Sequence, residues 1–213
     1  MALSKVDYNS LNVTAAASKA LLWNSSADGF ETGDLTGSLI LLETQTASSS
    51  GTLDFTSNID STYKEYIFKF YDMHPETDGV EFEFQSDTGT NTNYNQTITS
   101  ATFSAYHTEA DDDPAFSYAG GRDIAQGTTF QTLTHDVDND NDSSCSGTLH
   151  IFEPSSTTFA KHFFADVHVM NGDGAQRCFT SGYFNTTTAI TRFQFKMNSG
   201  DIDSGVIKLY GIT

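Results

Sequence analysis

The feature that most constrains this chain is a repeated alternation of large apolar and polar residues at a period of two. Val80, Phe82 and Phe84 alternate with Glu81 and Glu83. Successive side chains of a β-strand point to opposite faces, so this period predicts strands that are half buried against a core. An amphipathic helix would show a period near 3.6 instead.

Other segments extend this pattern along the chain. Residues 66–71 carry apolar groups on both faces of the expected strand, and residues 192–197 and 206–211 alternate. Turn-forming sequences such as TDG at 77–79 and NGDG at 171–174 separate the segments. Short strands at this spacing predict an all-β, antiparallel two-sheet β-sandwich of jelly-roll type. Further strands are expected at 39–46, 51–56, 94–100, 102–108, 115–119, 146–153, 161–170 and 178–185.

The N-terminal region differs from the rest. We expect an extended arm and linker over residues 1–35 and the β-sandwich domain over residues 36–213, with one short helix in the Ala-rich segment 15–22. The arm holds too few apolar residues for a core of its own, which predicts that it binds a partner surface; a floppy terminus is the alternative. The expected partner-binding residues are Leu3, Val6, Tyr8, Leu11, Val13, Leu21, Leu22 and Trp23.

The charge of the chain excludes two classes of function. It has 10 Lys and Arg residues against 28 Asp and Glu residues, a formal net charge of −18. A surface this negative repels phosphate backbones and anionic lipids, so we expect no nucleic-acid binding and no membrane insertion. No stretch approaches the run of about 18 apolar residues that spans a bilayer.

The cysteines are interpreted from the redox state of the compartment in which the chain folds. The first residues lack the continuous apolar segment of a secretory signal, so we expect folding in a reducing cytoplasm. Cys145 and Cys178 are the only cysteines. One disulfide is the arithmetic alternative, but the compartment favours two buried thiols.

Candidate metal ligands occur in an acidic run with alternating carboxylates, which are the ligands that calcium prefers. The run departs from the EF-hand pattern, since Asn141 and Gly147 stand where that loop needs Gly and Glu. A solvated acidic loop is the favoured interpretation, and calcium binding outside the EF-hand pattern is the alternative. The candidate ligands are Asp136, Asp138, Asp140 and Asp142.

No catalytic motif is present. The chain lacks the GxSxG, HExxH and GxxxxGK[ST] patterns, and Glu81 and Glu83 on one strand do not by themselves form a glycosidase pair. We therefore expect neither an enzyme nor a bound cofactor. A sugar-stacking face is a further hypothesis, although most aromatic residues on such strands belong to the core. Its candidates are Trp23, Tyr63, Tyr66, Tyr71, Tyr94, Tyr106, Phe116, Tyr118 and Tyr183.

Four blocks of the sequence resemble virion structural proteins of marine tailed bacteriophages. Together they cover most of residues 38–213, in a shared order that ends in Tyr-Gly-Ile, while the first 35 residues carry less of the resemblance. The blocks read SLILLETQTASSSGTLDFTSNIDSTYKEYIFKFYDMHPETDGVEFEFQS, SCSGTLHIFEPSSTTFAKHF, SGYFNTTTAITRFQFKMNSGDIDSG and VIKLYGIT.

The resemblance implies a non-enzymatic structural protein of a phage particle, with no catalytic residues to carry over. An outer capsid decoration or cement protein is expected, made in the bacterial host cytoplasm and placed on the virion surface. The alternative is a tail-associated receptor-binding or carbohydrate-binding module. The implied partners are a capsid or tail protein and further copies of the chain, as a homotrimer.

Overall fold

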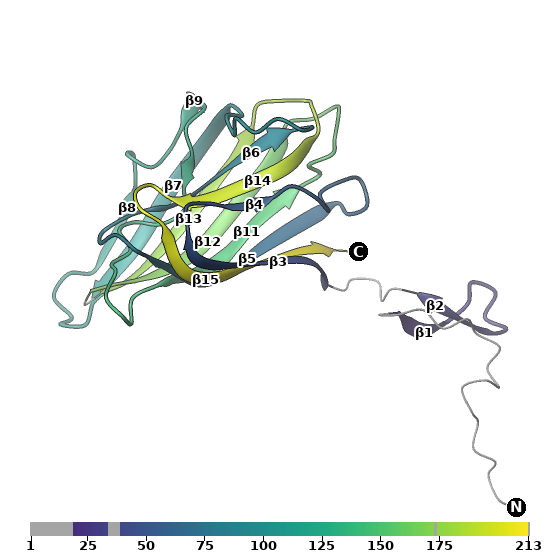
Figure 1. Ribbon diagram of the computed structural model, residues 1–213, viewed down its shortest axis with the longest axis horizontal. Helices are drawn as coiled ribbons and strands as arrows, with labels where there is room; N and C mark the ends of the chain where they lie inside the picture. The colour runs from purple at the N-terminus through teal and green to yellow at the C-terminus, as the bar shows by residue number, and fades with distance from the viewer. Residues whose placement is uncertain (1–18, 34–38, 173, 213) are drawn as a thin grey trace, which may run out of the picture. The chain divides into compact units, whose positions relative to one another are not determined.

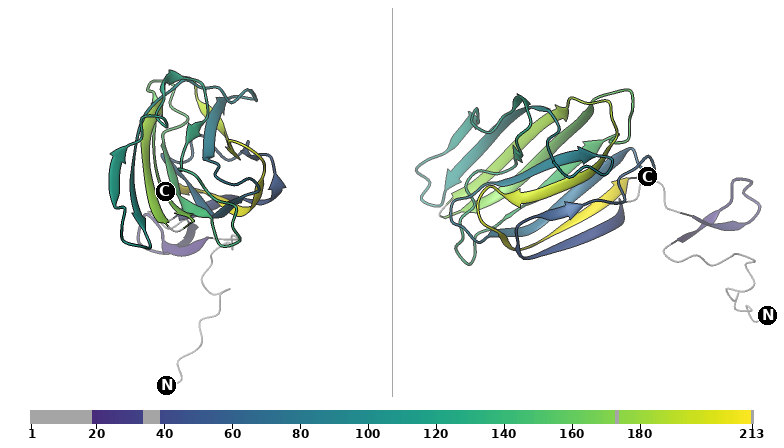
Figure 2. Two further views of the ribbon diagram at one scale, coloured as in Figure 1. Left: turned by 90° about the vertical axis from the view of Figure 1, so that its left-hand side faces the viewer. Right: turned by 45° about the horizontal axis from the view of Figure 1, so that its top comes forward.

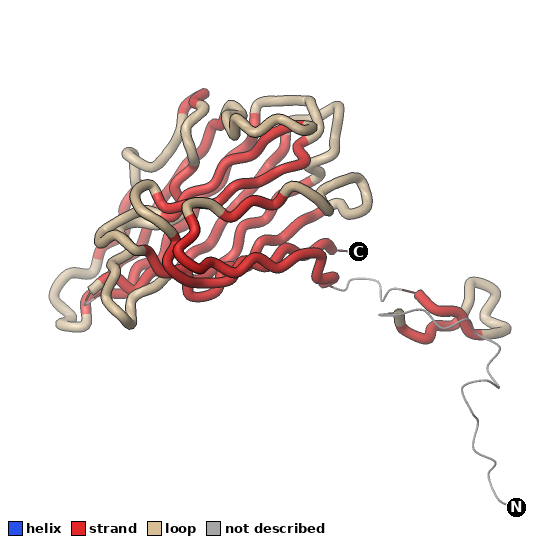
Figure 3. Tube along the Cα trace, in the orientation of Figure 1, coloured by secondary structure: helices blue, strands red, loops and turns tan. Residues whose placement is uncertain are grey.

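The regular structure of the described residues consists of strands. The computed structural model describes residues 19–33, 39–172 and 174–212, and within these ranges no helix occurs (Figure 3). The strand pairs within each of its sheets are antiparallel wherever their register is defined. The all-β, antiparallel part of the expected fold is therefore confirmed. In the part of the chain that the structure describes, no helical segment has the length and apolar character needed to span a membrane.

The chain divides into two compact units, which are described separately. The first ends at Leu39, and the second covers Ile40–Ile212. The second unit contains nearly all of the strands, which form one large and one small sheet (Figure 1).

The large sheet has nine strands in the order β3-β15-β5-β11-β12-β13-β7-β8, and β9 also pairs with β7. Its centre is a meander, because β11, β12 and β13 follow one another in sequence and in space. The bounds are β3 (Leu39–Ser50), β5 (Glu65–Pro75), β7 (Ile98–Thr108), β8 (Ala115–Tyr118), β9 (Ala125–Gly127), β11 (Cys145–Phe152), β12 (Lys161–Asn171), β13 (Gly174–Phe184) and β15 (Ile202–Ile212).

The small sheet has four strands in the order β10-β6-β14-β4 and lies against one face of the large sheet (Figure 2). Its long central pair joins β6 to β14, in the register Phe84↔Phe195. The bounds are β4 (Leu53–Phe55), β6 (Phe82–Thr88), β10 (Gln131–Thr132) and β14 (Ile190–Met197).

The core lies between the two sheets and is rich in phenylalanine. The ring of Phe195 on β14 is 5.0 Å from Phe68 and 5.4 Å from Phe70, both on β5. Phe84 on β6 is 5.3 Å from Phe163 on β12, with the rings edge to face. These contacts join the apolar face of one sheet to that of the other, as the period-two alternation predicted.

The first unit contains a short hairpin of β1 (Ala20–Trp23) and β2 (Phe30–Gly33). The expected helix is therefore wrong over Ala20–Leu22, while residues 15–17 lie outside the described residues. The turn explains the difference. The Asn24 N–H donates to the Gly29 carbonyl at 3.0 Å, which closes a hairpin, whereas an isolated helix of this length is marginal.

Strand positions agree with the sequence pattern more closely than strand ends do. The two strands expected at 94–100 and 102–108 are one strand, β7, which begins at Ile98. Tyr94 lies outside the strand because its backbone is in the left-handed region, with φ of 45°; its ring is buried and its N–H donates to the Asp87 carboxylate at 2.9 Å. A side chain–backbone bond of this kind competes with strand pairing.

Candidate functional site

The face of the large sheet that points away from the small sheet carries the main candidate site. We call it the outer face. On β12, Ala165 and Val167 point inward and are buried, whereas Phe164 and His168 point outward and are exposed. His162 and His168 lie on this same face, as their spacing of six predicts.

An aromatic ridge crosses the outer face from β13 to β8, and we define it as Phe103, Phe116 and Phe179. Phe103 and Phe179 are direct partners in the register, with ring centroids 5.0 Å apart and planes 20° apart. Phe116 on β8 lies 5.6 Å from Phe103 and is 74% exposed. Apolar rings thus occupy both faces of the large sheet, because a second Phe cluster fills the core.

A fixed ion pair borders the ridge. The Nε of Arg177 donates to Oδ1 of Asp166 at 2.8 Å, and a second guanidinium nitrogen donates to Oδ2. These hydrogen bonds lower the pKa of Asp166 below its usual value, so the carboxylate is ionised at neutral pH. The guanidinium also lies 4.5 Å from the ring centroid of Phe179. Arg177 and Asp166 therefore present a planar, preorganised polar group.

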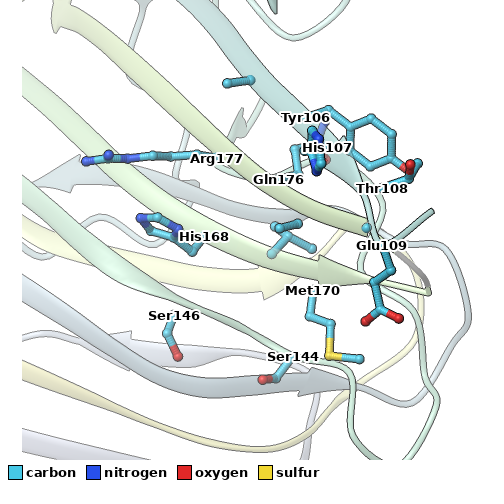
Figure 4. A pocket seen from close by; sticks show the side chains of 14 residues that line it. Tyr106, His107, Thr108, Glu109, Ser144, Ser146, His168, Met170, Gln176 and Arg177 are labelled. Carbon is cyan, nitrogen blue, oxygen red and sulfur yellow. The ribbon is translucent and has the colours of Figure 1, made fainter. Parts of the chain in front are cut away.

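A depression of about 660 Å³ lies beside this ion pair, and we call it the Arg177 depression (Figure 4). It is hollow because small residues stand opposite larger ones in neighbouring strands: Arg177 pairs with Ala105 in the register. A side chain at Gly174 would collide with the ring of Tyr106. The principal lining residues are Ala105, Tyr106, Ser144, Ser146, His168, Met170, Gly174, Ala175 and Arg177.

A second depression of about 520 Å³ lies on the same face, and we call it the Phe164 depression. Phe164 stacks on His150 with centroids 4.3 Å apart, and His150 is held by Glu65 at 2.6 Å. The lining residues are Thr99, Ser100, Ala101, Phe152, His162, Phe163, Phe164, Ser181, Gly182 and Tyr183.

The cations of the outer face contact either an aromatic ring or a carboxylate. Lys69 lies 5.5 Å from the ring centroid of Tyr210, and Lys208 lies 5.5 Å from that of Tyr71. Arg177 is paired with a carboxylate, as described above. Lys69 and Lys208 are direct register partners, so this part of the face carries two neighbouring cations, in a chain whose net charge is −18.

The structure assigns only some of the expected sugar-stacking residues to this face. Tyr71 and Tyr118 are exposed on it, together with Phe116, whereas Tyr66 and Tyr94 are buried. The sequence hypothesis omitted Phe103, Phe164 and Phe179. The signal for one of them was present: Phe163 and Phe164 are consecutive, so one of the pair had to point away from the core.

The hairpin of the first unit contains the described part of the expected partner-binding set. Leu21 is 47% exposed and Trp23 is 64% exposed, while Leu22 is half-buried. Trp23 stacks on Phe30 with centroids 4.5 Å apart. Burial of these side chains against a partner remains a prediction. Leu3, Val6, Tyr8, Leu11 and Val13 lie outside the described residues.

The acidic run is not gathered into a group of candidate metal ligands in the part of the chain that the structure describes. Among the described residues no group of three or more His, Cys, Asp or Glu side chains could hold a metal ion. Val137 is buried and bridges Val80, so this segment is fixed by its apolar residue. Asp136 lies 3.6 Å from Arg122, and burial raises the pKa of Asp138. The calcium hypothesis for Asp136, Asp138, Asp140 and Asp142 therefore finds no ligand set.

A polar cluster around Arg122 has partners within the protein. Arg122 lies 2.7 Å from Oε1 of Glu81, while Glu83 lies 3.7 Å from Lys196. Burial raises the pKa of Glu83. Half-buried His135 has a lowered pKa, first because of burial and then because of the positive charge of Arg122. Each of the two glutamates is thus held by a cation.

The two cysteines are buried and free, as expected. Burial raises the pKa of the Cys178 thiol to about 11 and raises that of Cys145 further. Thiols of this kind are poor nucleophiles, because the thiolate is the reactive form.

The comparisons with known proteins place no constraint on this site. No protein-family model, no curated protein and no solved structure matches the chain.

Proposed function

We propose that this chain is a non-enzymatic structural protein of a bacteriophage particle and that it decorates the outer surface of the capsid. The observation that carries the proposal is the exposed apolar hairpin in the first unit. Leu21 and Trp23 on β1 and Phe30 on β2 are all more than a third exposed. Large apolar groups gathered in this way favour an interaction surface.

The hairpin is too small to be stable by itself. Each of its strands has four residues, and an isolated two-stranded hairpin is marginal in water. A partner that covered Trp23 and Leu21 would remove their apolar surface from water, at about 25 cal/mol per Å². We propose that residues 1–35 form an arm with this anchoring role and that the partner is a capsid protein.

The proposed fold of residues 36–213 is a two-sheet sandwich of jelly-roll type. The order of the strands supports this assignment. From β3 to β7, and again from β13 to β15, consecutive strands alternate between the large and the small sheet. Alternation between two packed sheets is typical of Greek-key and jelly-roll connections, although the β11-β12-β13 meander interrupts it here.

The charge supports an external position. A net charge of −18 would be repelled by packaged DNA, so the proposed site is the virion surface, reached after synthesis in the host cytoplasm. We further propose a homotrimer. Three arms linked through one trimer would bind together by effective concentration even if a single arm binds weakly.

A second candidate function is favoured by a specific observation. The outer face carries an aromatic ridge and two depressions, features that suit a tail-associated receptor-binding or carbohydrate-binding module.

Binding to undecorated capsids tests the proposed anchor. Full-length protein, a form lacking residues 1–38 and a Trp23→Ser variant would be mixed with the capsids, with Phe159→Ser as the matched control because Phe159 is 71% exposed outside the hairpin. We expect the control to bind capsids like the full-length protein, and we expect the truncated form and the Trp23→Ser variant to lose this binding. Normal incorporation of the truncated form would refute arm anchoring. Loss of full-length binding at high salt would instead indicate attachment through acidic surface.

A further inference from the structure

We propose that the outer face of the large sheet binds a neutral glycan, with one sugar ring seated in the Phe164 depression against the exposed side of the Phe164 ring. This inference rests on the second candidate function and specifies its ligand class and site. It does not require that the chain decorate a capsid.

The Phe164 ring is prepared for stacking. His150 on β11 supports the ring from one side, and Glu65 holds His150 in turn. On the other side, the register partner of Phe164 is Ser181 on β13, a small residue. His150 therefore covers one face of the Phe164 ring, and the other face lies on the side of the small Ser181 side chain. Phe164 is 41% exposed. A rigid aromatic surface binds a flat apolar ligand face with little loss of conformational entropy.

Polar groups line the same depression. The hydroxyls of Ser181 and Tyr183 and the ring nitrogens of His162 have no hydrogen-bond partner among the described residues of the protein. They alternate with apolar lining residues such as Ala101 and Phe152. A ligand that fits must offer both an apolar face and several hydroxyl groups, which is the chemistry of a sugar ring.

The depression continues in the direction of the strands. Along β13 the outward residues are Ser181, Phe179 and Arg177, and the last of these lines the Arg177 depression. Four residues of strand span about 13 Å, so the two depressions can hold neighbouring parts of one linear ligand. At the edge of the Arg177 depression, the Arg177–Asp166 pair offers planar donors and acceptors that are already oriented.

The charges favour a neutral glycan over other ligands. Arg177 is neutralised by Asp166, and the strongly acidic chain repels phosphate, so a nucleotide or a phosphorylated ligand is disfavoured. A flat protein surface would leave both depressions unfilled, whereas protein interfaces pack closely at their centres. A narrow oligosaccharide that enters both depressions fits this surface better.

The test measures binding of the isolated full-length protein to an array of neutral oligosaccharides built from hexoses and N-acetylhexosamines. We expect at least one of these probes to bind. Phe164→Ala removes the stacking surface and should weaken binding about tenfold or more. Phe159→Ala removes an exposed ring outside the depression and should leave binding unchanged.

A second variant keeps the test decisive if Phe164→Ala folds poorly. Ser181→Tyr fills the depression from an exposed position and should abolish binding while thermal unfolding stays as in the wild type. The inference is overturned if no neutral probe binds, or if both depression variants bind like the wild type. It is also overturned if Ser181→Tyr alters only self-association in sedimentation, which would assign this face to a second copy. Capsid attachment is measured separately, so failure here does not affect the proposed anchor.

Discussion

Phe103 on β7 and Phe179 on β13 stack in direct register on the outer face, with centroids 5.0 Å apart and planes 20° apart. This pair is separate from the core, where Phe84 and Phe195 belong to the small sheet and pack against the inner face. The large sheet thus bears one set of rings that holds the protein together and another that is free for contact with a ligand.

The core set should dominate stability. Phe195 is fully buried and contacts rings on both sheets, so Phe195→Ala should lower the free energy of unfolding by about 3–5 kcal/mol through lost burial and a cavity. The control, Phe159→Ala, removes a ring that is 71% exposed and should change it by less than about 0.5 kcal/mol. Urea denaturation measures both values, and equal effects would contradict this account of the core.

The second unit should fold without the first. The hydrophobic core cluster runs from Ala47 to Leu209 and contains no residue of the hairpin. A form lacking residues 1–38 should therefore retain a cooperative thermal transition with a Tm within about 4 °C of the full chain, the shift that roughly 1 kcal/mol produces in a domain of this size. A truncated protein that is unfolded, or that melts far lower, would show that the arm contributes to the core.

His135 should make stability depend on pH. Its folded pKa is lowered from 6.5, chiefly by burial, so the unfolded chain takes up the proton first as the pH falls. This contribution to the free energy of unfolding is present above about pH 6.5 and is lost as the pH falls through the folded pKa. Between about pH 7.5 and pH 5, the free energy of unfolding should therefore fall less in His135→Gln than in the wild type. Urea denaturation at each pH measures this difference.

The matched control for that comparison is His162→Gln, because His162 is exposed on the outer face. The stability of His162→Gln should change with pH as that of the wild type does, because the exposed His162 side chain has no buried contact to lose. If the free energy of unfolding depended on pH in the same way in His135→Gln and in the wild type, His135 would not be the source of the pH dependence.

The two thiols should be present but protected. Cys145 and Cys178 are both 1% exposed, and burial raises both thiol pKa values. A thiol reagent should therefore react slowly with native protein and should count two thiols after denaturation without reductant. A count of zero would show that the chain is oxidised and would contradict folding in a reducing compartment.

The sequence predicted the strands well because burial on one face leaves a direct trace at period two. The alternation of Val80, Phe82 and Phe84 is an example, and all three are buried. The hairpin was not predicted because the composition of Ala20–Leu22 favours a helix. The hydrogen bond from the Asn24 N–H to the Gly29 carbonyl closes a turn, and the segment forms a strand instead. Composition alone does not encode that closure.

The candidate site was predicted only in part. Exposure of Phe116 was within reach of the sequence hypothesis, but the pairing of Phe164 with Ser181 depends on the register between β12 and β13. A shift of one residue would exchange the two faces, so this depression could not be deduced before the register was known. For the same reason the spacing of Asp136, Asp138, Asp140 and Asp142 could not show that they fail to converge.

The proposal that the chain belongs to a phage particle is tested most directly by locating and counting it in intact virions by cryo-electron microscopy. We predict many symmetry-related copies on the outer capsid surface in groups of three, with density for the β1–β2 hairpin enclosed by the shell protein and residues 40–212 facing solvent. Copies confined to the tail would support the receptor-binding alternative over capsid decoration. Absence of the chain from purified particles would contradict the proposal.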